Sequence, residues 1–429
     1  MKRSKSKTPC KLWIFPLAVL MLVMQGCATT KPPSVDPLAY KNRAKSIVNE
    51  DVTVTVAVPT NSEAWAIYGV DLASKNIQPV WLEVRNQSAD TYWFLRSGLD
   101  PDYFSPSEAA FAFRKDSDEA YRKINEHFRN LEFKNPVRPG STEAGFALVN
   151  LDEGVKAIDI DLVSREKVKS FSFIIPDPDF KADYKLVDYE TLYDIGDIIK
   201  IENEKELRRV LEELPCCTTN ADGDKYGDFL NLVIVGEPDD IVPALVRRNW
   251  HLTEVMWSRA ILRSIKSFLQ GERYRYAPIS PLHVYGRPQD VGWQKARGSV
   301  NERNHMRFWL SPIRFRGKRV FVGQISRDIG VKFTFKSPTL ATHVIDPDVD
   351  EARRYFVEDL AYSQALAGIG YVKGVGVVSK EAPRMNLGGD PIYTDGLRAV
   401  LFLEPRPYSI SEIEQLEWES PLAHPGRWK

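Results

Sequence analysis

The chain has few cysteines and none of the spacings that mark a disulfide scaffold. Four cysteines occur among 429 residues, so the sequence predicts no disulfide-rich fold. Cys10 and Cys27 lie near the N-terminus, and Cys216 and Cys217 are adjacent. Adjacent cysteines in an oxidising compartment either close a vicinal disulfide or remain two buried thiols. Because no CxxC spacing is present, we favour these structural roles over a redox role.

Signatures of several large enzyme classes are also missing. The sequence contains no GxSxG, Walker or Rossmann signature. The stretch "NADGDKYGD" at residues 220–228 lacks the mid-loop glycine and the terminal glutamate of an EF-hand. We therefore interpret this stretch as a polar turn, and we predict no cofactor and no metal site.

The charge balance shows no surplus of basic residues. The whole chain has 58 lysines and arginines against 58 aspartates and glutamates. Removing residues 1–26 takes away five basic residues and no acids, which leaves 53 basic and 58 acidic residues. A general nucleic-acid binder needs a basic surplus to neutralise phosphates. We therefore expect no nucleic-acid partner.

The N-terminus has the plan of a secretory signal. Basic residues precede the apolar run "LWIFPLAVLMLVM", and about 13 helical residues span roughly 20 Å, which is less than a hydrocarbon core of about 30 Å. The string "VMQGC" resembles a bacterial lipobox, so we predict removal of residues 1–26 and lipidation of Cys27. The alternative is a plain signal peptide with an incidental cysteine. By resemblance to the lipoprotein sorting pattern, Ala28 favours the outer membrane, facing the periplasm.

The first half of the mature chain has a β pattern. Residues 27–49 are polar and rich in proline, which predicts a flexible tether. Between residues 50 and 176, strings such as "VTVTVAVP", "KAIDIDLVS" and "KSFSFIIP" alternate apolar and polar residues. Six or seven such strands predict an immunoglobulin-like β-sandwich. Residues 105–131 have helical spacing and predict a helical insertion between the strands.

The second half alternates between helices and strands. Helices are predicted at "NEKELRRVLEELP", "PDDIVPALVRRNW" and "TEVMWSRAILRSIKSFLQG", and a strand at "FLNLVIVG". A long hairpin is predicted at residues 304–335 around "RGK". We therefore predict an α+β protein, in which a mixed α/β domain at residues 185–405 follows the sandwich and residues 406–429 form a C-terminal tail.

The candidate functional residues lie on this hairpin and just after it. His305 and Arg307 are two residues apart on a predicted strand and so share one face. The string "ISRDIG" places Arg327 and Asp328 near the other end of the hairpin, and "ATHVIDPDVDEAR" brings His343 to the entrance of a helix.

The acids of that last string have a structural interpretation. Asp346, Asp348, Asp350 and Glu351 lie at a predicted helix start, where carboxylates cap free amides and favour the positive end of the helix dipole. His343 precedes the cap, and it is either a buried, hydrogen-bonded histidine or an acid–base group oriented by Asp346. A metal site would need a third ligand, for which only His305 is attractive.

Several long strings in the second half resemble the LssY C-terminal domain family. In chain order they are "LVRRNWHLTE", "SPLHVYGRPQDVGWQKAR", "NERNHMRFWLSP", "GKRVFVGQISRDIG", "ATHVIDPDVDEAR" and "NLGGDPIYTDGLRAVL". The resemblance covers residues from roughly 185 to 405 and implies a role in the cell envelope, near lipid phosphates. It implies no reaction, and the chain lacks the histidine–serine phosphatase signature that some members carry in a separate domain.

Two functional hypotheses follow. In the favoured one, the protein is a non-catalytic envelope lipoprotein that binds an envelope partner, or an anionic lipid or glycan group, through Arg307 and Arg327. In the alternative, it is a hydrolase or transferase for a phosphorylated envelope substrate, with His343, Asp346 and His305 as catalytic residues. The second hypothesis requires these side chains to meet in one cleft that solvent can reach.

Overall fold

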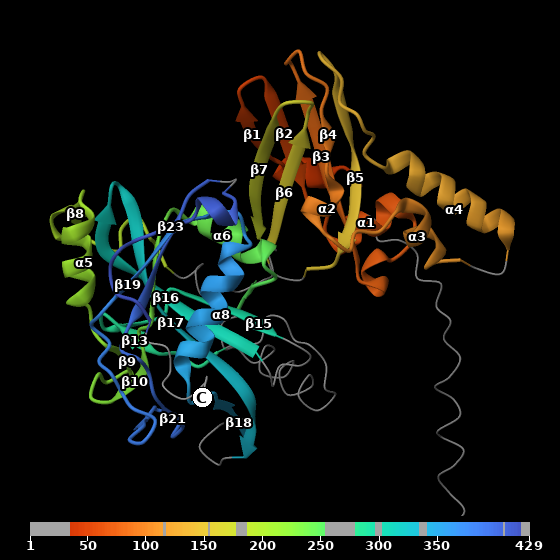
Figure 1. Cartoon of the computed structure of the whole chain (residues 1–429). Helices are drawn as coiled ribbons and strands as arrows, with labels where there is room; N and C mark the ends of the chain where they lie inside the picture. The colour runs from red at the N-terminus through yellow and green to blue at the C-terminus, as the bar shows by residue number, and fades with distance from the viewer. Residues whose placement is uncertain are drawn as a thin grey trace, which may run out of the picture.

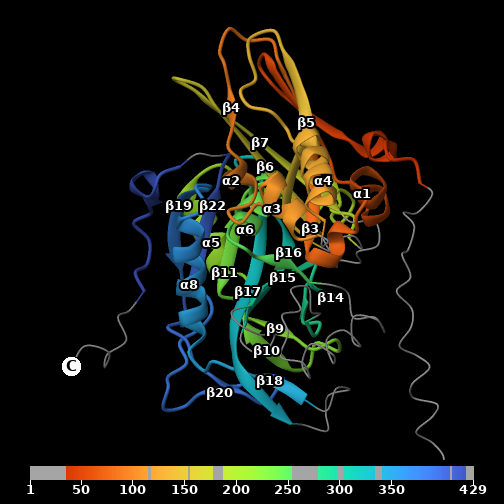
Figure 2. The same cartoon turned by 90° about the vertical axis from the view of Figure 1, so that its right-hand side faces the viewer.

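The computed structural model describes residues 35–114, 117–152, 155–176, 187–253, 279–296, 303–333, 341–405 and 408–421. The predicted signal peptide, Cys27 and the predicted helix at residues 253–271 lie outside these ranges, apart from Thr253. Figures 1 and 2 show two parts, one mainly of β-strands and one in which helices pack on a large sheet.

The first part contains two β-sheets that face each other. The strand orders are β1-β2-β3-β5 and β4-β6-β7. The strands are β1 (Lys45–Asn49), β2 (Val52–Ala57), β3 (Ile77–Asn86), β4 (Trp93–Phe94), β5 (Thr142–Asn150), β6 (Val155–Val163) and β7 (Val168–Pro176). Alternation sends every second side chain inward, so the core between the sheets contains Val52, Val54, Val56, Val80, Leu82, Val84, Ile158, Ile160, Leu162, Phe171 and Phe173.

Helices cover the other face of the four-stranded sheet. They are α1 (Asn61–Tyr68), α3 (Pro106–Phe111) and α4 (Asp118–Leu131), and a short helix α2 (Arg96–Leu99) follows β4. Thr60 and Ser105 begin α1 and α3 with capping boxes. Trp81 and Phe146 of the sheet pack against Tyr68 and Phe128 of the helices. The predicted helical insertion is confirmed as α3 and α4, whereas α1 was not predicted, and the immunoglobulin-like description of the sandwich stays a prediction.

Ordered structure begins before the predicted domain boundary at residue 50. A 3-10 helix at Ala39–Arg43 and strand β1 lie within the segment predicted as a tether. Tyr40 is buried against Trp81 and Phe146. The chain is therefore held by the first part from about residue 39 onward.

The second part is built on a mixed sheet of ten strands. Its order is β12-β15-β16-β17-β11-β22-β19-β23, with β18 beside β17 and β8 beside β16. The strands are β8 (Ile199–Ile201), β11 (Leu232–Val235), β12 (His251–Leu252), β15 (Val291–Ala296), β16 (Arg303–Phe315), β17 (Lys318–Phe333), β18 (Ala341–Ile345), β19 (Leu366–Val372), β22 (Arg398–Leu403) and β23 (Glu414–Gln415). Most pairings are antiparallel, and β11 runs parallel to β22 in the middle of the sheet. The predicted hairpin is confirmed as β16 and β17.

Both faces of this sheet are covered. Helices α6 (Pro238–Arg247) and α8 (Val349–Ala361) lie on one face, where Leu232, Ile234, Met306 and Phe308 form the core with them. Helix α5 (Glu204–Glu212) lies on the other face with Val233 and Val235. The run "LVIV" of β11 is apolar at every position because it is buried on both sides.

Three smaller elements complete the second part. Strands β9 (Cys217–Thr219), β10 (Tyr226–Phe229), β13 (His283–Val284) and β14 (Arg287–Pro288) form a separate sheet, and β20 (Arg384–Met385) pairs with β21 (Pro391–Ile392). In the predicted C-terminal tail, β23 pairs with β19 and the ring of Trp418 contacts Phe402. The described portion of the tail therefore belongs to the domain.

Helix α6 also joins the two parts. It packs against β6 and β7, and Arg247 Nη2 lies 2.6 Å from Asp159 Oδ2 of β6. Figure 1 shows α6 beside the ends of these two strands. Among the described residues, no helix is long and apolar enough to cross a membrane.

Candidate functional site

The candidate residues divide between the two faces of the ten-stranded sheet. On β16 and β17, Asn304 pairs with Arg327 and His305 pairs with Ser326. Because side chains alternate along a strand, His305 and Asp328 lie on one face, and Asn304 and Arg327 lie on the other. The second face is the one covered by α6 and α8.

Three side chains, those of Arg303, His305 and His343, meet around the buried carboxylate of Asp328, and we call these four residues the Asp328 cluster. Asp328 Oδ1 lies 2.9 Å from His305 Nε2, and Oδ2 accepts a hydrogen bond of 3.0 Å from Arg303 Nε. Asp328 is 2% exposed. Both carboxylate oxygens are therefore engaged, and solvent hardly reaches them.

His343 lies at the edge of this cluster. Its Nδ1 is 3.7 Å from Asp328 Oδ2 and has no hydrogen-bond partner among the described residues, while 30% of its side chain is exposed. Asp328, rather than the predicted Asp346, is thus the carboxylate beside this imidazole. His343 pairs with Val331 across β17 and β18.

The pKa values of Asp328 and His343 are both lowered, but for different reasons. Burial by itself would raise the pKa of Asp328, but His305 and Arg303 outweigh it and hold that pKa well below its usual range. Burial lowers the pKa of His343 to about 4, and the Asp328 charge only partly opposes this shift. At neutral pH the cluster therefore contains an ionised aspartate beside a neutral His343.

The guanidinium of Arg307 binds other groups inside the protein. Its Nε and Nη2 donate to the carbonyl of Ser280 at 3.1 and 2.8 Å, and its Nη1 donates to Gln324 Oε1 at 2.9 Å. Its Nη1 also lies 3.4 Å from His305 Nδ1. The residue is 4% exposed. These contacts leave Arg307 little access to an external anion.

Arg327 has different surroundings on the opposite face. Its Nε donates to Asn304 Oδ1 at 3.0 Å, and its guanidinium lies 5.3 Å from the centre of the Tyr355 ring on α8. Within the described part of the chain, Arg327 forms no ion pair. Lys295 Nζ lies 5.4 Å from the same ring but is paired with Asp359 at 2.9 Å.

Asp346 lies near Arg327 and at the start of α8. Its amide donates to the Arg327 carbonyl at 2.8 Å, and its Oδ1 accepts from the Asp348 amide at 3.1 Å. Burial raises the pKa of Asp346, and the positive charge of Arg327 acts against this rise. The predicted helix entrance is confirmed, since Asp348 is the N-cap of α8.

A second carboxylate of that helix start is buried rather than solvated. Asp350 is 1% exposed and accepts from Thr394 Oγ1 at 2.8 Å and from the Asp395 amide at 2.6 Å. Arg353, one turn later, binds Asp395 through Nη1 and Nη2 at 2.9 and 2.6 Å. This network fixes the start of α8 to the segment before β22, so these acids are architectural.

Sequence reasoning missed three buried polar residues. Arg303 completes the Asp328 cluster, and its position two residues before His305 on one strand was the signal that would have placed it there. Gln324 binds Arg307, and Arg398 is fully buried and donates to the carbonyls of Leu211, Leu214, Leu230, Pro215 and Gly374. Nothing in the sequence indicates which carbonyls converge on Arg398.

The adjacent cysteines and the polar turn agree with their structural interpretations. Cys216 and Cys217 form a vicinal disulfide. Arg384 Nη1 lies 2.9 Å from Cys217 Sγ. In the turn at residues 220–228, Asn220 Oδ1 accepts from the Lys225 amide at 3.0 Å. Over the described ranges, no three histidine, cysteine or acidic side chains are placed to hold a metal ion.

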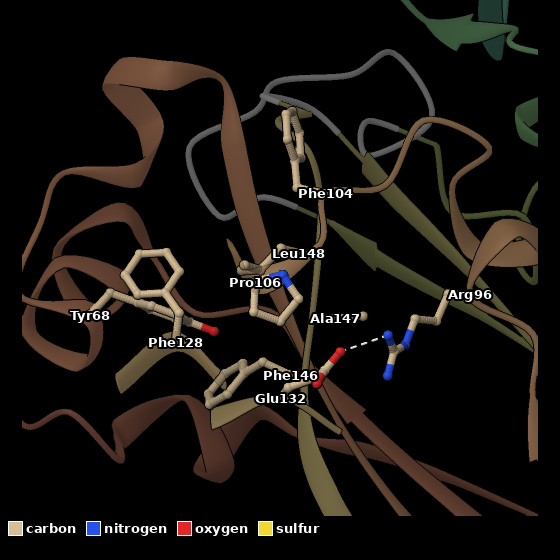
Figure 3. Close-up of a pocket in the computed structure, with 9 residues that line it drawn as sticks. All are labelled: Tyr68, Arg96, Phe104, Pro106, Phe128, Glu132, Phe146, Ala147 and Leu148. Carbon is tan, nitrogen blue, oxygen red and sulfur yellow. Dashed lines mark ion pairs between the residues drawn. The ribbon is translucent and has the colours of Figure 1, made fainter. Parts of the chain in front are cut away.

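A small pocket in the first part is too small for a ligand. Its volume is about 10 Å³, which is about the space for one water molecule. Figure 3 shows Arg96 and Glu132 facing each other beside it, and their side chains form an ion pair of 2.6 Å.

The comparison with protein families concerns the second part of the chain. Residues 208–397 match the family described as LssY C-terminus. This part of the chain is an LssY C-terminal domain. The match runs from α5 to the residue before β22, so it contains the Asp328 cluster, Arg307, Arg327 and Asp346. No curated protein matches the chain.

Proposed function

We propose that the protein is a lipid-anchored, non-catalytic component of the bacterial cell envelope, and that its LssY C-terminal domain binds an anionic group. The group belongs to a phosphorylated lipid, a glycan or an envelope protein. The observation that carries this proposal is the division of the candidate residues between the two faces of the sheet. His305 and Asp328 sit in a buried cluster with His343 at its edge, and Arg327 and Asp346 lie apart from it.

The Asp328 cluster supports a structural role. A catalytic carboxylate or imidazole needs to reach a substrate within hydrogen-bond distance. Asp328 is 2% exposed and His305 is 6% exposed, and each is engaged by other side chains of the protein. Arg307 is likewise held by Ser280 and Gln324. Asp328, His305 and Arg307 are therefore occupied inside the fold.

Arg327 supports the binding role. A guanidinium offers a planar fork of donors that suits phosphate and carboxylate alike. Among the described residues, Arg327 makes one hydrogen bond through its side chain, from Nε to Asn304 Oδ1. Stacking on Tyr355 orients the guanidinium without neutralising its charge, whereas Lys295, which lies near the same ring, is neutralised by Asp359.

Binding of vesicles tests this proposal. Vesicles of phosphatidylglycerol should bind the chain of residues 28–429 more tightly than vesicles of phosphatidylcholine, and Arg327→Ala should weaken this binding about tenfold, since one charge-assisted contact contributes roughly 1.5–3 kcal/mol. Arg316→Ala is the matched control, because Arg316 is exposed at the hairpin turn and pairs with Glu204. A parallel titration with inorganic phosphate shows whether the protein binds a soluble phosphate group or requires a membrane surface. Equal binding by wild type and Arg327→Ala would refute the role of Arg327.

The lipid anchor has its own test. The motif "VMQGC" supports lipidation of Cys27, and attachment through several acyl chains gives stable membrane association. Cys27→Ala should move the protein from the membrane fraction to the soluble fraction. Cys10→Ala is the control, because it changes a cysteine that lies within the predicted signal peptide. Membrane association that persists in Cys27→Ala would argue for a different anchor.

The enzyme hypothesis rests on His343 alone. Its partly exposed imidazole lies 3.7 Å from the ionised Asp328 and is neutral at pH 7, as a general base must be, but its pKa of about 4 makes it a weak base. A screen of phosphorylated envelope lipids for phosphate release, with wild type and His343→Ala compared, would detect such an activity.

A further inference from the structure

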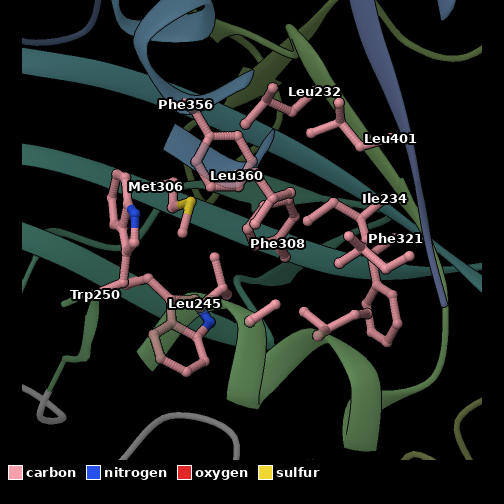
Figure 4. Close-up of a cluster of buried hydrophobic side chains, with 14 of the residues drawn as sticks. Leu232, Ile234, Leu245, Trp250, Met306, Phe308, Phe321, Phe356, Leu360 and Leu401 are labelled. Atoms are coloured by element: carbon pink, nitrogen blue, oxygen red, sulfur yellow. The ribbon is translucent and has the colours of Figure 1, made fainter. Parts of the chain in front are cut away.

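An apolar cavity lies where α6 meets the large sheet and the end of β7. Its volume is about 210 Å³, which exceeds the cavity of about 150 Å³ that binds benzene in another protein. Its walls include Ile174 of β7, Ile234 of β11, Val242 of α6, Trp293 of β15, Phe308 of β16 and Phe321 of β17. Figure 4 shows Ile234, Phe308 and Phe321 close together within the core cluster to which they belong.

The chemistry of the walls excludes a polar occupant. The described residues that line the cavity carry no charge, and the hydroxyl of Tyr189 is directed to the carbonyl of Asp290 at 3.2 Å. A water molecule needs two to four polar partners, and the described lining residues are mostly aliphatic or aromatic, with the Tyr189 hydroxyl already bound to Asp290. An empty space of this size also forfeits dispersion contacts that a close-packed interior normally makes. An apolar ligand needs no polar partners and restores these dispersion contacts.

The surroundings of the cavity are those of a built site. It lies between the two parts of the chain, which is a common position for ligand sites. The ion pair between Arg247 and Asp159 holds α6 in place. Next to the lining residues Tyr189 and Pro238, the charged side chains of Glu190 and Glu237 both bind Arg319, at 2.5 and 2.6 Å.

We propose that this cavity binds the alkyl chain of a lipid or fatty acid. In this proposal the polar head lies toward the charged side chains of Glu190 and Glu237, which are neighbours in the chain of the lining residues Tyr189 and Pro238. This site is separate from Arg327, which does not line the cavity. The proposal therefore goes beyond anion binding and does not depend on it.

Fluorescence of N-phenyl-1-naphthylamine, a neutral apolar probe, tests the proposal. Residues 28–429 provide the protein, because this chain includes all described residues and lacks the acyl chains of its own anchor. Val242→Phe narrows the cavity from α6, and Val246→Phe on the same helix is the matched control, because Val246 does not line the cavity. We expect Val242→Phe to weaken probe binding by about tenfold or more and Val246→Phe to leave it within about twofold. Val291→Phe narrows the cavity from the opposite wall and replaces Val242→Phe if that variant does not fold.

Competition identifies the source of the chain. Displacement of the probe by dodecanol supports a free alkyl chain, and displacement only by phosphatidylethanolamine vesicles supports a chain presented by a membrane. The proposal is overturned if the wild type does not bind the probe, if neither competitor displaces it, or if both cavity-narrowing variants bind it as the wild type does. Arg327→Ala should bind the probe normally, so failure of the anion-binding proposal would be seen separately.

Discussion

Arg327 and Asp328 are consecutive residues of β17, yet their side chains lie on opposite faces of the ten-stranded sheet. Asp328 contacts Arg303 and His305, whereas Arg327 contacts Asn304 and the ring of Tyr355. The two residues therefore belong to different environments, one buried and ionic and one at the border of α8. This separation underlies the proposed division between an architectural cluster and a ligand-binding arginine.

Asp328→Asn should strongly destabilise the protein. The amide cannot neutralise Arg303, which is 6% exposed and would remain charged beside it. Breaking a buried ion pair from one side costs about 3–5 kcal/mol. Urea unfolding of wild type and variant measures this loss, and Asp222→Asn in the exposed turn is the control, with an expected change within about 0.5 kcal/mol. A loss no larger than that of the control would contradict the architectural role of Asp328.

The two histidines of the cluster should differ in their contributions to stability. His305→Ala removes a buried group that lies 2.9 Å from Asp328 Oδ1, and we expect a loss of about 1–3 kcal/mol in the free energy of unfolding. Within the described part of the chain, His343 has no hydrogen-bond partner at Nδ1, and it is partly exposed, so His343→Ala should cost less than about 1 kcal/mol. Equal losses in the two variants would show that His343 is as tightly integrated as His305.

Acid should weaken the fold through His343. Its pKa is about 4 in the folded protein and about 6.5 in an unfolded chain. The unfolded state therefore binds more protons between these values, and the contribution of His343 to stability decreases as the pH falls from about 6.5 to about 4. His343→Ala lacks this contribution. The difference in unfolding free energy between wild type and variant should therefore be smaller at pH 5 than at pH 7.5, or reversed in sign. A cost that does not change with pH would contradict the lowered pKa.

Asp328 should add a second acid transition at lower pH. Its pKa in the folded protein lies well below the usual value of about 3.9. The stabilisation from the ionised carboxylate is therefore present above pH 4 and is lost as the pH falls further. In wild type, stability should decrease below pH 4 more steeply than in Asp328→Asn. Parallel curves for the two proteins in this range would argue against the depressed pKa.

Local patterns in the sequence predicted much of the fold. Alternating residues such as Val52, Val54 and Val56 identified strands because a half-buried strand has a period of two. Asn203 and Asp348 identified helix starts because their side chains cap free amides. The strings in the second half resembled the LssY C-terminal domain family, and the match at residues 208–397 confirms this family resemblance.

Contacts between distant segments could not be predicted in this way. The parallel pairing of β11 with β22 joins Leu232 to Ala399, and no local pattern specifies such a partner. Likewise, Arg307 is held by the carbonyl of Ser280, a main-chain group that the residue type does not reveal. In contrast, the sequence alone allows the prediction that Arg327 and Asp328 lie on opposite faces, because consecutive side chains alternate along a strand.

The most direct measurement of the central claim compares Arg327→Ala and Asp328→Asn for both stability and binding to phosphatidylglycerol vesicles. We predict that Arg327→Ala keeps its free energy of unfolding within about 1 kcal/mol of wild type and loses most of its binding. We predict the reverse for Asp328→Asn, which should lose stability and, while folded, still bind the vesicles. If Arg327→Ala lost stability and still bound vesicles as wild type does, the binding role of Arg327 would be contradicted. If Asp328→Asn remained stable and lost binding, the architectural role of Asp328 would be contradicted.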